Sequence, residues 1–395
     1  MLKTKIKITP ITRRLLPLYA AIFFQSIPLW YATEKFFMFN IGFTTATIGV
    51  MFAVMSVVML AVETPSGILA DRWSRKGVMM LGCLALMISA AIGIFSFNEP
   101  VYILSTVFWG IFAALYSGTY DAVIYETTIE EYGDSKYFEK YLGRSKAVEG
   151  ITFVIGALVG AFIASTFDLR DPYIISLPLI AVALIFLWKF KEPQLHKAEV
   201  SEPVFKHIRQ TFAAVLRNPV LVPVVIATVG FTILGEFIFE LSQLWFIAVA
   251  APIALFGVFN AAVFSSWTTG GLLAARIKSK TAIVGLMVMT LAMVVLLIAS
   301  RQYIFVLIAQ VILAVCLIAI GVILAKKMHD ELPSRLRAGS SSVISTIARI
   351  ILIPGSLLVT GIAQAYDMST ATYVLLGVAV ISVIAFTTIR SVKNK

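Results

Sequence analysis

The feature that most limits the possible folds of this chain is a series of long apolar stretches separated by short polar breaks. A helix needs about 20 apolar residues to cross the hydrocarbon core of a bilayer. Twelve stretches reach about this length, at 15–37, 44–69, 77–97, 101–125, 147–167, 173–190, 219–246, 252–274, 281–300, 302–325, 339–364 and 369–389. Charged residues make up only 13% of the chain, too few to cover a soluble protein of 395 residues but enough for two polar membrane rims. The sequence therefore predicts an all-α membrane protein with twelve transmembrane helices.

The basic residues predict the orientation of these helices. Of the 32 Lys and Arg residues, 28 fall at the termini or in the loops of one side. The opposite side has Lys35, Arg170 and Arg301, and Arg349 lies within a span. By the positive-inside rule we expect a multi-pass protein of the cytoplasmic membrane with both termini in the cytoplasm and an uncleaved first span. The net charge of +11 then indicates contact with anionic lipid headgroups on that side and does not imply nucleic acid.

An eleven-residue segment occurs twice, at Gly67–Gly77 and, 204 positions later, at Gly271–Thr281, with five identical positions. The repeat predicts two pseudo-symmetric six-helix bundles, at 1–190 and 219–395, joined by a cytoplasmic linker at 191–218. In the linker, apolar residues recur at helical spacing from Val204 to Leu216. We expect an amphipathic helix there, lying along the membrane interface.

The first copy of the segment reads Gly-Ile-Leu-Ala-Asp-Arg-Trp-Ser-Arg-Lys-Gly between spans 2 and 3. With twelve spans and a 6+6 duplication, the chain resembles the major facilitator superfamily over essentially its whole length. The stretches Glu63–Gly67 and Ser117–Glu126 are similar to a prokaryotic branch that contains many multidrug exporters. The resemblance implies two halves that rock about a central site and open it to each side in turn.

Two departures from that family pattern weaken an assignment as a drug–proton antiporter. No basic residue lies between Pro100 and Glu131, where many proton-coupled antiporters carry an arginine in span 4. The signature of span 5 is reduced to Gly156-Ala-Leu-Val-Gly160, without the usual proline. We interpret these two glycines as sites of close helix packing.

The resemblance further implies that the 2–3 loop latches the cytoplasmic side. Physically, Asp71 can cap the N-terminus of span 11, and the basic residues need an acidic partner, for which Glu126 is the natural choice. The alternative is that the basic residues only fix the topology. The expected latch residues are Gly67, Asp71, Arg72, Arg75, Lys76 and Glu126.

Glu63 and Arg349 are ionisable residues inside spans, where a charge costs several kcal/mol and indicates a function with a partner. Spans 2 and 11 face each other in the family fold. We therefore expect Glu63 and Arg349 to form an interdomain ion pair when the cytoplasmic side is closed. Alternatively, Arg349 binds an anionic group of the substrate.

Glu236 and Glu240 lie four residues apart, hence on one face of span 7, and Glu34 lies at a similar height in span 1. Spans 1 and 7 line the central cavity in the family. Two neighbouring carboxylates repel each other when ionised, which suits proton binding. The alternative is a solvent-wetted outer rim, with Glu34 paired to Lys35.

Asp121 near the inner end of span 4 is a further candidate proton site, or a residue simply paired with Lys146. Tyr116 and Tyr120 on the same span are candidates for a substrate pocket. Aromatic residues of this kind also pack helices together, and that alternative stays open.

These observations predict a secondary transporter that moves a small molecule by alternating access, driven by the proton gradient without a cofactor. The leading hypothesis is export of amphipathic, drug-like compounds. The alternatives are transport of a polar or anionic metabolite, and a non-transporting receptor or assembly factor on the same fold. No catalytic constellation or metal motif indicates an enzyme, Cys83 and Cys316 are expected to be packing residues, and we expect a monomer.

Overall fold

The computed structural model describes residues 10–193, 221–331 and 334–388, all helical or loop and without a strand. Side chains at 64, 68, 71, 135 and 329–342 are outside the description. The expected linker helix at Val204–Leu216 also lies outside the described residues.

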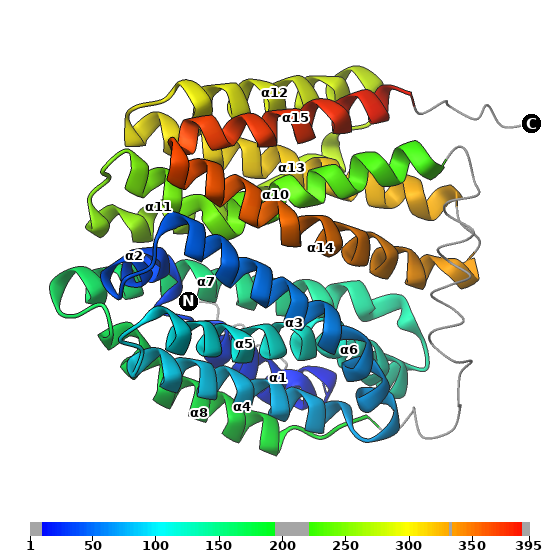
Figure 1. Ribbon diagram of the computed structural model, residues 1–395. Helices are drawn as coiled ribbons and strands as arrows, with labels where there is room; N and C mark the ends of the chain where they lie inside the picture. The colour runs from blue at the N-terminus through cyan, green and yellow to red at the C-terminus, as the bar shows by residue number, and fades with distance from the viewer. Residues whose placement is uncertain (1–9, 194–220, 332–333, 389–395) are drawn as a thin grey trace, which may run out of the picture. The chain divides into compact units, whose positions relative to one another are not determined.

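The helices are α1 (Pro10–Gln25), η1 (Tyr31–Thr33), α2 (Glu34–Asn40), α3 (Thr45–Arg72), α4 (Arg75–Ile94), α5 (Glu99–Tyr116), α6 (Thr119–Tyr132), η2 (Ser135–Tyr137), α7 (Phe138–Thr166), α8 (Asp171–Lys189), α10 (Leu221–Ala248), η3 (Ile253–Leu255), α11 (Phe256–Arg276), α12 (Lys280–Ala299), α13 (Tyr303–Glu331), α14 (Ser334–Ala365) and α15 (Met368–Thr387) (Figure 1).

Eleven stretches of helix in the described part of the chain are long and apolar enough to cross a membrane. They correspond in order to the predicted spans 2–12. The first predicted span is broken into α1 and α2, so neither part reaches the length of a crossing by itself. Span 4 is also interrupted, by a turn at Ser117–Gly118 between α5 and α6. We expected continuous spans at 15–37 and 101–125, and both contain non-helical backbone.

Short polar residues begin several helices. The Asn98 side chain accepts a hydrogen bond from the Val101 amide at 3.2 Å at the start of α5, and Ser279 caps α12 in the same way. Asp367 caps α15 by accepting from the Thr370 amide at 2.6 Å. These side chains satisfy amides that have no partner inside the helix, which explains why the apolar runs begin where they do.

The chain forms two compact units, residues 1–31 with 58–200 and residues 32–57 with 201–395. In the first, α4 packs between α5 and α8, α8 packs on α1, and α1 contacts α7. In the second, α12 packs between α13 and α15, α15 packs on α10, and α10 contacts α14 (Figure 1). These four contacts therefore recur between helices at corresponding positions along the chain.

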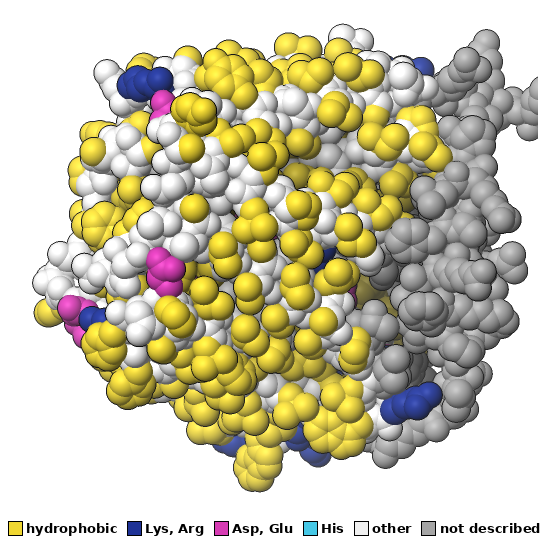
Figure 2. Space-filling model, viewed as in Figure 1, with side chains coloured by type: hydrophobic (Ala, Val, Ile, Leu, Met, Phe, Trp, Pro, Cys, Tyr) yellow, Lys and Arg dark blue, Asp and Glu magenta, His cyan; other side chains and the backbone are white. Residues whose placement is uncertain are grey.

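Many large apolar side chains lie on the outside, and several small polar ones are buried inside. Phe162, Ile185 and Trp188 are more than half exposed, and apolar side chains cover most of the described face in Figure 2. Inside, Ser89 and Ser105 are hydrogen-bonded to each other at 3.1 Å and are buried. Apolar exteriors with paired polar groups inside are typical of helices that face lipid.

Candidate functional site

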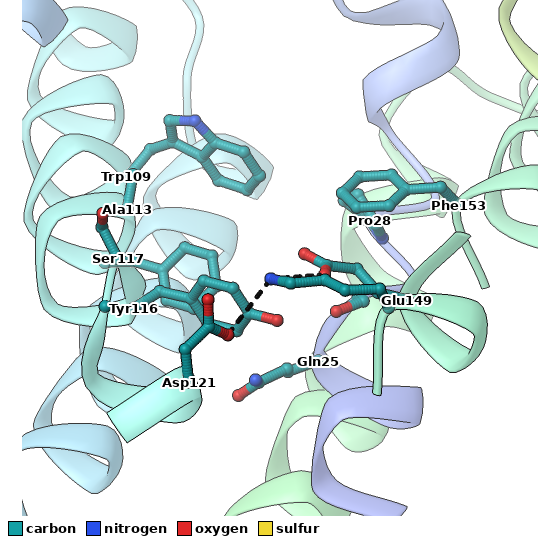
Figure 3. A pocket seen from close by; sticks show the side chains of 13 residues that line it. Gln25, Pro28, Trp109, Ala113, Tyr116, Ser117, Asp121, Glu149 and Phe153 are labelled. Atoms are coloured by element: carbon teal, nitrogen blue, oxygen red, sulfur yellow. Dashed lines mark ion pairs between the residues drawn. The ribbon is translucent and has the colours of Figure 1, made fainter. Parts of the chain in front are cut away.

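A cavity of about 320 Å³ lies in the first unit, at the two places where spans 1 and 4 lose their helical backbone. It is enclosed by the end of α1, the α5–α6 turn and α7. Its lining residues are Gln25, Ser26, Pro28, Trp109, Phe112, Ala113, Tyr116, Ser117, Gly118, Asp121, Lys146, Glu149 and Phe153 (Figure 3). Irregular backbone at membrane depth is tolerated where it lines a cavity, and in transporters such breaks mark binding sites.

Glycines permit both interruptions. Gly118 has φ +75°, a left-handed conformation that a side chain disfavours, and it separates α5 from α6. On α7, a Cβ added to Gly160 would lie 1.8 Å from the carbonyl oxygen of Leu29, which belongs to the non-helical part of span 1. Gly156 lies against Ile27 of the same segment. The two span-5 glycines thus make room for the broken backbone of span 1.

Three charged side chains meet in this cavity. The Lys146 ammonium lies 3.4 Å from a carboxylate oxygen of Asp121 and 3.4 Å from one of Glu149, so α6 and α7 are joined across the cavity (Figure 3). Glu149 is largely buried, with 12% of its side chain exposed, whereas Asp121 and Lys146 are more than 40% exposed. The lining therefore holds two carboxylates and one ammonium, an excess of one negative charge, which favours a polar or cationic ligand.

Gln25, at the end of α1, supplies a hydrogen-bond donor. Its side chain is 2% exposed, and its carbonyl oxygen accepts from the Tyr120 hydroxyl at 2.9 Å. Its amide nitrogen is buried and has no hydrogen-bond partner in the described part of the chain. A buried donor left unpaired costs about 1–3 kcal/mol, which a ligand acceptor in the cavity recovers.

Aromatic side chains form one wall. The ring centroids of Trp109 and Phe112 are 5.6 Å apart, as are those of Phe112 and Tyr116. Tyr116 and Glu149 both line the cavity. Tyr120, the other predicted pocket residue, is buried behind this wall, with its ring centroid 4.4 Å from that of Tyr116. Tyr116 therefore lines the cavity, and Tyr120 positions Gln25.

A second cavity, also of about 320 Å³, lies in the other unit between α10, α13 and α14. Its charged lining residues are Glu236 of α10 and Arg349 of α14, with Thr228, Thr232 and Ser345 as further polar groups. Glu236 and Arg349 thus bring opposite charges to one cavity. Helices α10, α13 and α14 correspond in chain order to spans 1, 4 and 5, so each unit carries a charged cavity at the equivalent place.

Part of the expected latch is an ion pair in the first unit. Arg75 Nη2 lies 2.6 Å from Glu126 Oε1, and both side chains are more than 90% buried. Arg72 and Gly67 are exposed, Lys76 donates to the carbonyl of Trp188 at 2.6 Å, and the Asp71 side chain is outside the described residues. The pair joins the start of α4 to α6.

Glu192, which the sequence interpretation did not single out, also binds this loop. Its carboxylate accepts from the Ser74 hydroxyl at 2.7 Å and from the amides of Arg75 and Lys76 at 2.5 and 3.3 Å. An anion at the N-terminus of a helix is favoured by the free amides and the helix dipole. The end of span 6 is thereby fixed to the start of span 3.

The remaining predicted residues lie elsewhere. Glu34 pairs with Lys35, which is buried and whose amide donates to Gln243 at 3.0 Å. Glu240 lies one turn from Glu236 and outside the lining of its cavity. Glu63 belongs to the first unit and Arg349 to the second, so the expected pair between them stays a prediction.

Glu149 and Gln25 were missed as site residues, and Lys146 was considered only as a partner of Asp121. Lys146 and Glu149 could have been recognised from the sequence, because they are opposite charges three residues apart at the start of an apolar run. Arg14 contributed to the sequence analysis only as one of the basic residues that predict topology. Its guanidinium nitrogens lie 3.0 Å from a carboxylate oxygen of Glu130 and 2.9 Å from one of Glu131, and these ion pairs join α1 to α6. That contact has no local sequence signal.

Two helical units, apolar exteriors and charged cavities between the helices are typical of a membrane transporter. The family model of the Major Facilitator Superfamily matches residues 15–351, and the chain belongs to this superfamily.

Relatives and solved structures give the same fold. The chain is 22% identical to the MFS-type transporter YxaM of Bacillus subtilis (strain 168) over 162 residues, which is 41% of this chain and 37% of that protein. A crystal structure of the nucleoside transporter NupG matches with TM-score 0.77 and 14% identity, covering 98% of this chain and 100% of the other. The D-xylose–proton symporter matches with TM-score 0.68 and 12% identity, covering 96% and 98%. At these identities, the structural matches show the fold alone.

Proposed function

We propose that this transporter is proton-coupled and exports small amphipathic compounds that carry a flat apolar part and a polar or cationic group. The observation that carries the proposal is the cavity of the first unit, where Asp121, Lys146 and Glu149 lie opposite an aromatic wall. Its volume of about 320 Å³ is at the lower end of the range for small-molecule sites.

The lining matches such a compound group by group. The rings of Trp109, Phe112 and Tyr116 offer apolar and π surface to a flat or cationic moiety. The Gln25 amide donates to a carbonyl or hydroxyl of the ligand. A ligand amine competes with Lys146 for the carboxylates of Asp121 and Glu149.

Proton coupling follows from the same competition. When no cationic ligand is bound, a proton on Asp121 or Glu149 removes the excess negative charge of the cavity. Ligand and proton then exclude each other, which is the requirement for antiport. Export as the direction rests on the resemblance to a branch rich in exporters and on this aromatic, acidic lining.

The test uses purified protein in liposomes with a trapped pH dye and an imposed pH gradient. The panel contains aromatic amines, sugars, amino acids and organic acids, and the likeness to nucleoside and xylose transporters adds nucleosides and pentoses. We expect aromatic amines to trigger proton flux, and Glu149→Gln to reduce it about tenfold or more, equivalent to about 1.4 kcal/mol. Glu139→Gln, an exposed site on the same helix, is the matched control. If folded, monodisperse protein shows no proton flux with any compound of the panel, the proposal is wrong.

A second candidate is transport of a polar or anionic metabolite. It is favoured by one observation, the position of Arg349 in the cavity of the second unit. In the liposome assay, flux triggered by organic acids and insensitive to Glu149→Gln supports this candidate over the first.

A further inference from the structure

The cavity of the second unit contains a set of groups that the proposed amine site does not use. Arg349 presents a guanidinium, and Thr232 and Ser345 line the same space from α10 and α14. The opposite side is lined by Gly321, Ala325 and Met328 of α13, which leave room but offer no charge. An arginine beside hydroxyls in a cavity of about 320 Å³ is suited to a carboxylate.

Glu236 is the internal competitor for that arginine. It lines the same cavity and carries the opposite charge. Two opposite charges that share a cavity in an apolar surrounding stabilise each other, since either charge alone is costly there. If a ligand carboxylate binds Arg349, Glu236 loses its partner and becomes neutral by taking a proton from water.

Among the described side chains, Arg349 is the basic residue in the lining of this cavity, and the other charged groups around α10 lie outside that lining. Glu240 lies one turn from Glu236 on α10 and outside the lining, and Glu34 and Lys35 of α2 meet α10 near Gln243. Among the described residues, α15 carries no acidic or basic side chain, and Lys327 of α13 lies over the ring of Phe386. Arg349 is the charged side chain that shares the cavity with Glu236.

The equivalent cavity of the first unit also combines acidic and basic side chains. There the basic residue comes from α7, the fifth span, as Arg349 comes from α14, the fifth span of its half. In the first cavity two carboxylates outnumber one ammonium, whereas in the second one carboxylate faces one guanidinium. The second cavity therefore has no excess negative charge to repel an anion.

We infer that the cavity of α10, α13 and α14 is a carboxylate-binding subsite in which ligand binding to Arg349 drives protonation of Glu236. The inference rests on the proposed function only in taking the chain as a proton-coupled transporter, and it adds a second chemical group that the protein recognises. The carboxylate belongs either to the transported molecule or to a separate small organic acid.

The test measures proton uptake by the purified, detergent-solubilised protein in weakly buffered solution, so it does not depend on transport. The probe is 3-phenylpropionate, which has a ring and a carboxylate. We expect its addition to cause uptake of about one proton per protein, as the linkage between anion binding and carboxyl protonation requires. Uptake should be lost in Glu236→Gln and in Arg349→Gln and kept in Glu240→Gln, the matched carboxylate one turn away.

Two matched probes distinguish the sources of the carboxylate. Phenethylamine has the ring and the amine without the carboxylate, and it should cause no Glu236-dependent uptake. Phenylalanine has both groups. Tighter binding of phenylalanine than of 3-phenylpropionate places the carboxylate on the transported molecule, whereas equal or weaker binding indicates a separate organic acid.

Absence of uptake with 3-phenylpropionate, or uptake unchanged by Glu236→Gln, would overturn the inference. Retained size-exclusion profiles and melting temperatures show that the variants are folded, and Arg349→Lys, which keeps the charge, should recover part of the uptake. If amines drive proton flux in liposomes but 3-phenylpropionate causes no proton uptake in detergent, the proposed function stands and the subsite is wrong. If the uptake assay responds while amines drive no flux in liposomes, the subsite stands and amine export is wrong.

Discussion

At the scale of single residues, burial decides which ion pairs matter. Arg75 and Glu126 are more than 90% buried, so removing one partner leaves a charge without compensation in a site shielded from water. The contacts of Arg14 with Glu130 and Glu131 are partly exposed and screened.

We predict that Glu126→Gln lowers the free energy of unfolding by about 3 kcal/mol or more, whereas Glu131→Gln changes it by about 1 kcal/mol or less. Thermal or denaturant unfolding of both variants in the same detergent measures the difference. Equal losses for the two variants would contradict the assignment of Arg75–Glu126 as a buried structural pair.

A second residue-scale prediction concerns Asp367 at the start of α15. The hydrogen bond from the Thr370 amide lowers the pKa of the Asp367 carboxyl below its usual value. A lowered folded-state pKa means that this stabilisation is fully present above the ordinary pKa and is lost as the pH falls through the folded-state value. Asp367→Ala should cost about 1 kcal/mol near neutral pH, and the difference from the wild type should shrink only in acid. Melting temperatures of both proteins across the acidic range check this, and Asp367→Asn, which keeps a capping oxygen, should lack the pH-dependent part.

At the scale of elements, the decisive feature is that spans 1 and 4 are broken where they meet the cavity. The break in span 1 requires a residue without a side chain at the point of contact on α7. Gly160 is that residue, because a Cβ there would overlap the Leu29 carbonyl. Gly143, on the same helix, has open space around its Cα.

We therefore predict that Gly160→Ala displaces the segment at Leu29, lowers stability by about 1–3 kcal/mol and reduces ligand-driven proton flux. Gly143→Ala should be neutral or stabilising by up to about 1 kcal/mol, since alanine favours the helix. Melting temperature and liposome flux of the two variants provide the measurement. Normal flux in Gly160→Ala would show that the break in span 1 does not shape the cavity.

At the scale of the whole molecule, the uneven distribution of Lys and Arg predicts the orientation. Helix α7 is one of the spans, and it separates Lys140, at its polar start, from Asp168, just beyond its end. Both positions are exposed, and the native Cys83 and Cys316 are buried, so background labelling is low.

We predict that a cysteine replacing Lys140 reacts with a membrane-impermeant maleimide only from the cytoplasmic side, and one replacing Asp168 only from the opposite side. Intact cells and inverted vesicles give the two accessibilities. Reaction of both positions from one side, or the reverse assignment, would contradict the topology.

The family and the positions of spans 2–12 were accessible from the sequence because both depend on local patterns. Hydropathy over about 20 residues and the repeat of Gly67–Gly77 needed no knowledge of helix packing. The interruption of span 1 was not accessible, because it depends on the contact of Leu29 with Gly160, more than 100 residues away.

The residues of the candidate sites also fall into two groups, those recognised from the local sequence and those identified only by helix packing. Asp121, Glu236 and Arg349 were recognised from the sequence because a charge within an apolar run is costly wherever the helix packs. Their partners were decided by tertiary structure, since packing brings Lys146 and Glu149 of α7 to Asp121 and places Arg349 in the cavity of Glu236. Apolar runs are a local property of the chain, whereas the proximity of two side chains depends on how separate helices pack, and only the folded molecule determines that.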